Sequence, residues 1–305
     1  MINPKYASAL QTILKEGSLT AAAKKLYITQ PALSQTVKAA ENELGAPIFT
    51  RDGGRLSLTY AGQLYMDAMA AIQTIDKKLH AEIADSKDVV YGEFSLGISH
   101  QRGSQLLPEF LPEFIRLYPH VKLRLVEEGS DRLEKMIADG SCDMAFLTTD
   151  SRRTNLTYWP IQPEKIVLVA AKTTALAKKY PDGTALDIRE AAEETFVSMT
   201  EGHSVRKVQD RLFDIYDLHP KILLETHNME AAKNIAACAD AVFLVPSVYI
   251  NDAMPYREQI CVYEIKNRDY ERHFYFCCRQ DMYLTGYARD LVRIVCERLK
   301  VSCPL

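Results

Sequence analysis

Residues 18–35 read Ser-Leu-Thr-Ala-Ala-Ala-Lys-Lys-Leu-Tyr-Ile-Thr-Gln-Pro-Ala-Leu-Ser-Gln, and this stretch decides the fold of the N-terminal part. Ser18 and Thr29 are each suited to cap a helix, because a hydroxyl can accept a hydrogen bond from an unpaired first-turn N–H. Apolar residues recur at helical spacing after each cap, and Pro31 falls where a missing N–H costs nothing. The pattern predicts two short helices joined by a turn at residues 27–29.

The second predicted helix has two different faces. Its apolar stripe, Leu33, Val37, Ala40 and Leu44, packs against the first helix. Its opposite face carries short or flexible polar side chains, which suit base edges and phosphates: Gln30, Ser34, Gln35 and Lys38. In a helix-turn-helix, the start of the second helix enters the major groove of DNA. The helix pattern alone leaves open an ordinary helical protein with a polar surface.

A hairpin is predicted directly after these helices. Gly45 suits a helix end, and residues 47–59 alternate around Gly53-Gly54. Arg51 and Arg55 then lie near the tip of a wing, where we expect them to contact phosphates together with Thr59.

Residues 3–66 resemble the winged helix-turn-helix of LysR-type transcriptional regulators. The match runs through residues 18–35, continues in Glu41–Arg51 and ends in Leu58–Gly62; Ala40 departs from it, since most members carry a larger aliphatic residue there. The resemblance implies a double-stranded DNA operator as partner. The DNA-binding residues that we expect are Ser18, Thr29, Gln30, Pro31, Ser34, Gln35, Lys38, Arg51, Arg55 and Thr59.

The charge distribution fits a separate DNA-binding head. Residues 1–60 hold seven Lys/Arg against four acidic residues, a balance of +3. Because the whole chain of 305 residues carries −3, the remainder carries −6. A basic head on an acidic body is typical of a DNA reader with a sensing module.

Residues 60–88 are predicted to form one long helix. Apolar residues recur at alternating spacings of three and four, close to a heptad: Tyr65, Ala68, Ile72, Ile75, Leu79 and Ile83. The helix either packs on its own domain or pairs with a second subunit. We favour a homodimer or homotetramer, since helix-turn-helix proteins usually read paired half-sites. Residues 85–88 are interpreted as a hinge.

From Tyr91 onward, strands alternate with helices of about ten residues, which predicts βαβ units and a largely parallel sheet. We expect, among others, a helix over 106–117 and a strand over 144–147. This half resembles the effector-binding domain of the same family, with the two-lobed fold of periplasmic binding proteins; the matching stretches are 96–108, 118–123, 140–146 and 234–246. Cys238-Ala239-Asp240 departs from the family's usual Gly-Leu-Gly, with an unknown effect on the ligand cleft.

The expected fold class is therefore an α+β multi-domain chain with a winged helix-turn-helix, a long linker helix and a two-lobed α/β effector domain. The expected bounds are 1–60 for the DNA-binding domain, 61–88 for the linker and 89–305 for the effector domain. Within the last, lobe I takes about 91–161 and 267–302, and lobe II about 162–266.

Ligands of two-lobed α/β domains lie beyond the carboxyl ends of the strands, often against helix N-termini. Polar residues in such loops are ordinary caps or line the effector cleft. The residues that we assign to the cleft, several of them through the resemblance, are Ser99, His100, Gln101, Thr148, Thr149, Thr200, Glu201, Gly202, His203, Thr226, His227 and Asn228. Hydroxyls at helix starts suit a carboxylate, whereas Glu201 and Asp240 suit an amine, so a carboxylate or an amino acid are both open.

Other classes of function find little support. No Walker loop, zinc-protease motif, nucleophile elbow or dinucleotide fingerprint is present, so we expect no enzyme and no cofactor. His273, Cys277 and Cys278 are the best metal or redox candidates, yet adjacent cysteines on a strand point to opposite faces, and we expect no metal. Cys142 and Cys238 are expected to be buried thiols, and no cysteine pair of the peroxide-sensing branch is found.

We expect neither a signal peptide nor a membrane span, because residues 1–30 carry no apolar segment typical of a signal peptide and no run of apolar residues is long enough to cross a membrane. The seven cysteines are scattered, which favours a reducing compartment. We expect a cytoplasmic transcription regulator that binds DNA, is modulated by a small-molecule effector and contacts no membrane. The alternative is a solute-binding module without specific DNA binding. The effector, the target genes and the choice between activation and repression are left open.

Overall fold

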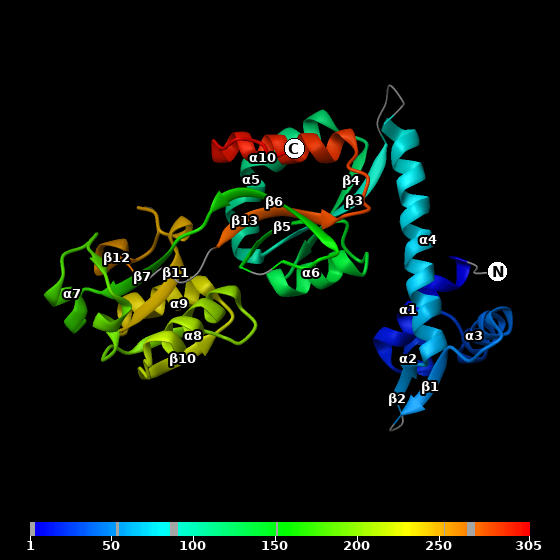
Figure 1. Ribbon diagram of the computed structural model, residues 1–305, viewed down its shortest axis with the longest axis horizontal. Helices are drawn as coiled ribbons and strands as arrows, with labels where there is room; N and C mark the ends of the chain where they lie inside the picture. Colours follow the sequence, from blue (N-terminus) through cyan, green and yellow to red (C-terminus); the bar gives the residue numbers. More distant parts are fainter. Residues whose placement is uncertain (1–3, 53–54, 86–90, 151, 253, 267–271) are drawn as a thin grey trace. The chain divides into compact units, whose positions relative to one another are not determined.

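The computed structural model describes residues 4–52, 55–85, 91–150, 152–252, 254–266 and 272–305. The chain divides into two compact units, residues 1–87 and 88–305 (Figure 1). The linker helix belongs to the first unit. Most of the expected hinge, residues 86–88, lies outside the described residues.

The first unit is the predicted winged helix-turn-helix with its long helix. Its elements are η1 (Pro4–Tyr6), α1 (Ala7–Glu16), α2 (Leu19–Lys25), α3 (Gln30–Leu44), β1 (Phe49–Asp52), β2 (Arg55–Leu58) and α4 (Tyr60–Asp85). The two predicted caps are both formed, because the Ser18 hydroxyl accepts from the Ala21 N–H and the Thr29 hydroxyl from the Ala32 N–H. β1 and β2 pair antiparallel, as expected for a hairpin.

The core of this unit joins the helices, the wing and the start of α4. Leu10, Leu33, Ile48 and Met69 are fully buried in it. Gly62 permits the close approach of α4 to the wing, because a Cβ there would lie 2.1 Å from the Ile48 carbonyl oxygen. The wing is thus held rigidly against the helices by packing.

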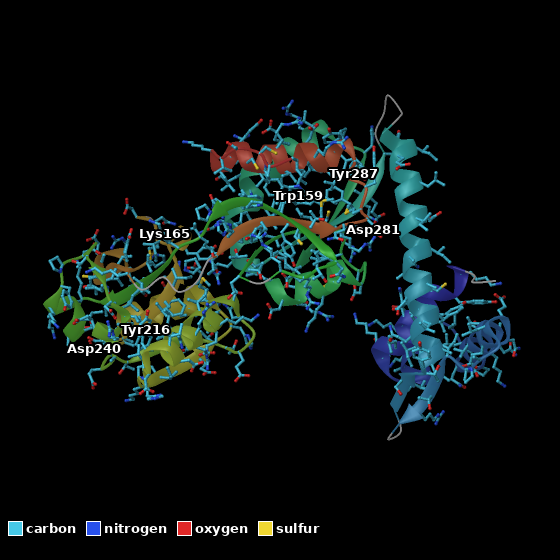
Figure 2. The ribbon with its side chains drawn as sticks, viewed as in Figure 1. Trp159, Lys165, Tyr216, Asp240, Asp281 and Tyr287 are labelled. Carbon is cyan, nitrogen blue, oxygen red and sulfur yellow. The ribbon has the colours of Figure 1, made fainter. Side chains whose placement is uncertain are left out.

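Lobe I of the second unit is a sheet covered on both faces (Figure 1). The strand order is β4-β3-β5-β13-β6; α5 and α10 cover one face and α6 the other. Figure 2 labels Trp159 on β6, which packs on Phe276, and Tyr287 on α10, which stacks on Phe94. The elements are β3 (Gly92–Ile98), α5 (His100–Leu117), β4 (Val121–Glu127), α6 (Ser130–Ala138), β5 (Met144–Thr149), β6 (Leu156–Pro163), β13 (His273–Arg279) and α10 (Gly286–Leu299).

Lobe II is built around a sheet of order β10-β9-β11-β7-β12-β8. The chain enters it after β6 and returns from β12 to β13. Its elements are β7 (Ile166–Ala171), α7 (Ala175–Lys179), β8 (Ala185–Leu186), η2 (Ile188–Ala191), β9 (Phe196–Met199), α8 (Ser204–Tyr216), β10 (Ile222–Thr226), α9 (Met229–Cys238), β11 (Val242–Pro246), η3 (Ser247–Tyr249), η4 (Arg257–Gln259) and β12 (Ile260–Ile265).

Three expectations need correction. Both sheets are mixed, since β13 runs antiparallel to β5 and β6, and β7 antiparallel to β11 and β12. α5 begins at His100 rather than at residue 106, because Ser99 caps it and two prolines inside do not end it. β5 extends through Thr149, so Thr148 and Thr149 lie within this strand rather than after it.

Candidate DNA interface and effector cleft

The outer face of α3 is open to solvent along its first turns. Gln30, Pro31, Gln35 and Lys38 are exposed and Ser34 is half-buried. The inner stripe is buried, with Leu33 and Ala40 at 0% exposure. The expected polar face is therefore presented as one surface at the start of α3.

The wing places one of its predicted phosphate ligands on the surface. Arg51 is exposed on β1, whereas the side chain of Arg55 on β2 lies outside the described residues. The Thr59 hydroxyl is used within the fold, because it donates to the Pro47 carbonyl at 2.6 Å and accepts from the Gly62 N–H. The Ser18 and Thr29 hydroxyls cap helices. Ser18, Thr29 and Thr59 therefore stabilise the fold at the expected interface through their hydroxyl groups.

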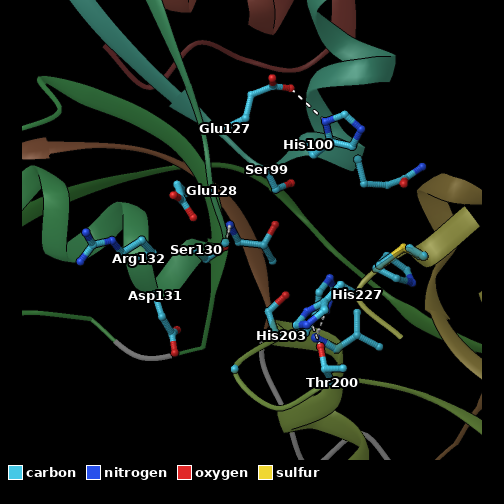
Figure 3. Close-up of a pocket in the computed structure, with 18 of the residues that line it drawn as sticks. Ser99, His100, Glu127, Glu128, Ser130, Asp131, Arg132, Thr200, His203 and His227 are labelled. Carbon is cyan, nitrogen blue, oxygen red and sulfur yellow. Dashed lines mark hydrogen bonds and ion pairs between the residues drawn. The ribbon is translucent and has the colours of Figure 1, made fainter. Parts of the chain in front are cut away.

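A cavity of about 1010 Å³ lies between the two lobes (Figure 3). Four helices begin at its wall: α5 after Ser99, α6 at Ser130, α8 at Ser204 and α9 after Asn228. Because helix N-termini offer unpaired N–H groups and partial positive charge, this wall favours an anionic group.

The structure brings most of the predicted cleft residues together around this cavity. Those that line it are Ser99, His100, Gln101, Thr148, Thr200, Glu201, Gly202, His203, His227 and Asn228. Thr149 is instead buried in β5, and Thr226 accepts from the Asn228 N–H and does not line the cavity. Asp240 is exposed at the far end of α9 (Figure 2), so it offers no carboxylate to a ligand amine in the cleft.

A buried ion pair at the crossing between the lobes was missed from the sequence. The Arg272 Nη2 lies 2.7 Å from a Glu164 oxygen, and the two side chains are 3% and 2% exposed. Arg272 also donates to the carbonyl and the hydroxyl of Ser204 at the start of α8. Glu164 and Arg272 both line the cavity. In the sequence, the pair could have been suspected only because a charged residue stands beside each segment that crosses between the lobes.

Two further contacts join the lobes at the rim of the cavity. Gln101 on α5 donates to Glu230 on α9 at 2.5 Å, and Lys207 on α8 pairs with Asp131 on α6. Glu230 is itself held by Lys233 at 2.8 Å. These contacts connect lobe I to lobe II, so any change in lobe placement must break or shift them.

Three histidines line the cavity and differ in environment (Figure 3). The His203 Nδ1 accepts from the Val205 N–H at 3.2 Å and so caps α8. Burial, with the nearby charges of Arg272 and His227, lowers the pKa of His203 to about 4, so this ring is neutral at pH 7. His227 is hydrogen-bonded to the Thr200 hydroxyl at 2.6 Å, and His100 lies 3.2 Å from Glu127.

The cysteines separate into buried and accessible thiols. Cys277 and Cys278 are buried on opposite faces of β13, as predicted for neighbours on a strand. Burial raises the pKa of Cys142 to about 11, which keeps it as an unreactive thiol. The expectation of a buried Cys238 is wrong: it is exposed, because the buried stripe of α9 ends at Ala237.

Within the described part of the chain, no group of three or more His, Cys, Asp or Glu side chains is placed to hold a metal ion. Among the described helices, none is both long and apolar enough to cross a membrane.

Two protein-family models match the chain. The bacterial regulatory helix-turn-helix of the lysR family matches residues 6–63, and the LysR substrate binding domain matches residues 87–300. A similar curated protein is the uncharacterized HTH-type transcriptional regulator YcgK of Bacillus subtilis (strain 168), 29% identical over 80% of this chain and 79% of its own. The HTH-type transcriptional regulator CfxR of Cupriavidus necator is 27% identical over 77% of this chain and 72% of its own.

Solved structures share the fold. A full-length variant of OxyR from Pseudomonas aeruginosa matches over 100% of both chains with a TM-score of 0.69 and 16% identity. Full-length CbnR complexed with its target DNA matches over 98% of this chain and 99% of its own, with a TM-score of 0.56 and 18% identity. The alternative of a solute-binding module alone finds no support, because both domains match their models. The chain belongs to the LysR family of DNA-binding transcriptional regulators with a C-terminal effector-binding domain.

Proposed function

We propose that this regulator binds a partly palindromic operator as a homodimer or homotetramer in the cytoplasm, and that a small carboxylate or amino acid in the lobe cleft modulates it. The observation that carries the DNA part is the exposed polar face at the start of α3, together with the exposed, basic Arg51 of the wing in the same unit. A relative of the same fold has been solved with its target DNA, which supports this use of the head.

The contacts that we assign follow from the side-chain chemistry. Gln30 and Gln35 are exposed amides, each able to pair with adenine through two hydrogen bonds. Lys38 and Arg51 neutralise phosphates and make binding salt-dependent. Ser34 approaches base edges, while Ser18, Thr29, Pro31 and Thr59 hold the helices and the wing in position.

Association of subunits is assigned to α4. Its stripe begins buried, with Tyr65 at 2% exposure, and continues exposed, with Ile75 at 68%, Leu79 at 53% and Ile83 at 45%. Exposed apolar residues at this spacing suit a second helix of the same kind. Leu79→Glu is expected to dissociate the assembly, as measured by analytical ultracentrifugation.

The effector is assigned to the cleft because four helix N-termini and the polar residues of both lobes meet there. A ligand changes the activity of the regulator only through a difference in its affinity for two arrangements of the lobes or subunits. The rim contacts Gln101–Glu230 and Lys207–Asp131 are the groups that such a difference acts on.

The DNA assignment is tested by fluorescence anisotropy with the intergenic DNA beside the gene, at two salt concentrations and against unrelated DNA. We expect selective binding that weakens with salt, and loss of that selectivity in Gln35→Ala with Arg51→Ala. Absence of binding at either salt concentration would contradict the proposal.

The cleft assignment is tested with Ser99→Ala and Thr200→Ala. A screen of small carboxylates and amino acids against the operator complex first identifies a ligand that changes its affinity. Both variants are then expected to weaken this response without changing operator binding in its absence. Thr285→Ala is the matched control, because it removes the cap of α10 away from the cavity. A full response in both cleft variants would show that the ligand binds elsewhere.

A further inference from the structure

Arg102 is a buried cation that the DNA and cleft assignments do not use. It lies in the first turn of α5, three residues after the Ser99 cap, and is 5% exposed. Its guanidinium carbon lies 4.2 Å from the centroid of the Phe274 ring. Its Nε and Nη2 are buried and have no hydrogen-bond partner within the described residues. Buried arginines are normally paired, so this group requires an explanation.

The charges around Arg102 do not balance. Among the described residues, the buried carboxylates are Glu134 and Glu164. Glu164 is bound by Arg272 through Nε and Nη2, at 3.1 and 2.7 Å. Glu134 accepts from the Tyr158 hydroxyl and lies near Arg153. The interior beside the cleft therefore holds two guanidinium groups against the single carboxylate of Glu164.

Tyr249 places this excess charge next to the cavity. Burial raises the pKa of Tyr249, the Glu164 charge raises it further, and the charges of Arg102 and Arg272 oppose this shift, together with a hydrogen bond to Ser99. Tyr249 and Ser99 both line the cavity. The Arg102 N–H donates to the Ser99 hydroxyl, and its neighbours Gln101 and Ser104 line the cavity, so an uncompensated positive charge lies behind the wall where α5 begins.

A ligand carboxylate would balance this charge. Arg102 does not itself line the cavity, so it acts on a ligand through its charge rather than through a direct contact. A charge interaction at a buried position is screened less than one in water. Exposed carboxylates line the cavity (Glu127, Glu128 and Glu201), and so do the exposed cations Arg132 and Lys135. The buried charge of Arg102 therefore favours a ligand whose negative group is directed inward, towards the start of α5.

We infer that Arg102 supplies the positive charge that the carboxylate of the effector neutralises, and so selects a carboxylate over its uncharged isostere. This inference rests on the proposed function, in which the cleft holds the effector. Arg102 is assigned here as a residue that determines specificity, in addition to the helix N-termini.

The experiment uses acetate as the probe, because its small size imposes little demand on cavity shape. Unfolding of the full chain is followed by the fluorescence of Trp159, the single tryptophan, which lies in lobe I. Acetate at about 50 mM is compared with chloride at equal ionic strength and with acetamide. We expect acetate alone to raise the unfolding temperature of the wild type, by about 2 °C.

Three variants separate charge from packing. Arg102→Met is expected to abolish the acetate shift and to leave the ligand-free unfolding temperature unchanged or higher, because it removes an unpaired buried charge. Arg102→Lys keeps the charge and should retain the shift. Arg293→Met, which removes an exposed arginine paired with Asp290, should behave like the wild type.

Two results would overturn the inference: an equal shift with acetate and chloride in the wild type, or an equal acetate shift in Arg102→Met. A marked loss of stability in ligand-free Arg102→Met would assign the arginine to packing alone. These readouts need no DNA. An acetate shift without operator binding would therefore contradict the proposed DNA binding and leave the assignment of Arg102 standing. Operator binding without an acetate shift would contradict the assignment of Arg102 and leave the proposed DNA binding standing.

Discussion

The proposed DNA-binding surface and the proposed effector cleft are built in opposite ways. On α3, the described contacts include no side-chain hydrogen bond or ion pair of Gln30, Gln35 or Lys38, so these groups are free for a ligand. In the cleft, Gln101 and Thr200 are already bonded to residues 129 and 27 positions away. The reading surface comes from one rigid helix, whereas the cleft is assembled from both lobes. A change in the head should therefore act locally, and a change in the cleft should affect the whole effector unit.

The largest effect expected in the cleft is that of Glu164→Gln. The change leaves Arg272 buried without its counter-ion, next to the charge of Arg102, and should destabilise the effector unit by about 3–5 kcal/mol. Denaturant unfolding followed by Trp159 fluorescence measures this loss.

Glu113→Gln is the matched control for this change. It removes a carboxylate from an exposed pair with Arg298 and should cost less than about 1 kcal/mol. Equal losses of unfolding free energy in the two variants would show that burial of the Glu164–Arg272 pair adds nothing to its effect on stability. The contrast between a coupled cleft and a local head would then lose its strongest support.

The second prediction concerns the loss of stability at acidic pH. Because the folded protein lowers the pKa of His203 from 6.5 to about 4, the unfolded chain binds a proton there that the folded chain does not. The contribution of this ring to stability is present above pH 6.5 and is lost as the pH falls towards 4, by about 2 kcal/mol at pH 4.5.

His203→Asn tests this prediction, since asparagine also caps a helix and does not titrate. Between pH 7 and pH 4.5, the free energy of unfolding of the variant should fall by about 2 kcal/mol less than that of the wild type, as measured by urea unfolding. His219→Asn, at an exposed ring, is the control. Identical acid profiles for wild type and His203→Asn would contradict the prediction.

The third prediction tests the local character of the head. Gln35→Ala should weaken operator binding by about 1–3 kcal/mol, or roughly fivefold to 150-fold, while binding to unrelated DNA and the stability of the effector unit stay unchanged. Gln63→Ala on α4, whose amide bonds Asp67, is the control in the same unit. An equal loss on both DNAs would assign Gln35 to phosphate instead of bases.

The same contrast explains which parts of the fold and of the site can be predicted from the sequence. The sequence predicts the two helix caps of the head and the buried stripe of α3, because Ser18, Thr29 and the apolar spacing from Leu33 are local signals. The loops of the cleft could also be identified, since polar residues follow strands there. The Glu164–Arg272 pair could not, because its partners are 108 residues apart and neither belongs to a periodic pattern.

Errors in the second unit have one local cause and one long-range cause. Cys238 stands in an apolar run of the sequence, yet it falls just beyond the buried stripe of α9. β6 pairs antiparallel with β13, and β12 pairs antiparallel with β7. The order of these strands in the sheets depends on pairing between distant segments, which residue patterns do not encode. The excess charge of Arg102 likewise becomes visible only when all its neighbours are known.

The smallest predicted effect concerns Asp240, one of the positions at which the chain departs from the pattern of its family. Asp240 follows α9 with a φ of +50°, a left-handed conformation that glycine adopts at little cost. Asp240→Gly should therefore stabilise the effector unit by about 0.5–1 kcal/mol in urea unfolding. Because Asp240 does not line the cavity, the acetate shift should stay unchanged. Ala239→Gly, at a φ of −116°, offers no such gain. An altered acetate shift in Asp240→Gly would mean that this distant turn is coupled to the cleft, and that lobe II is less modular than its contacts indicate.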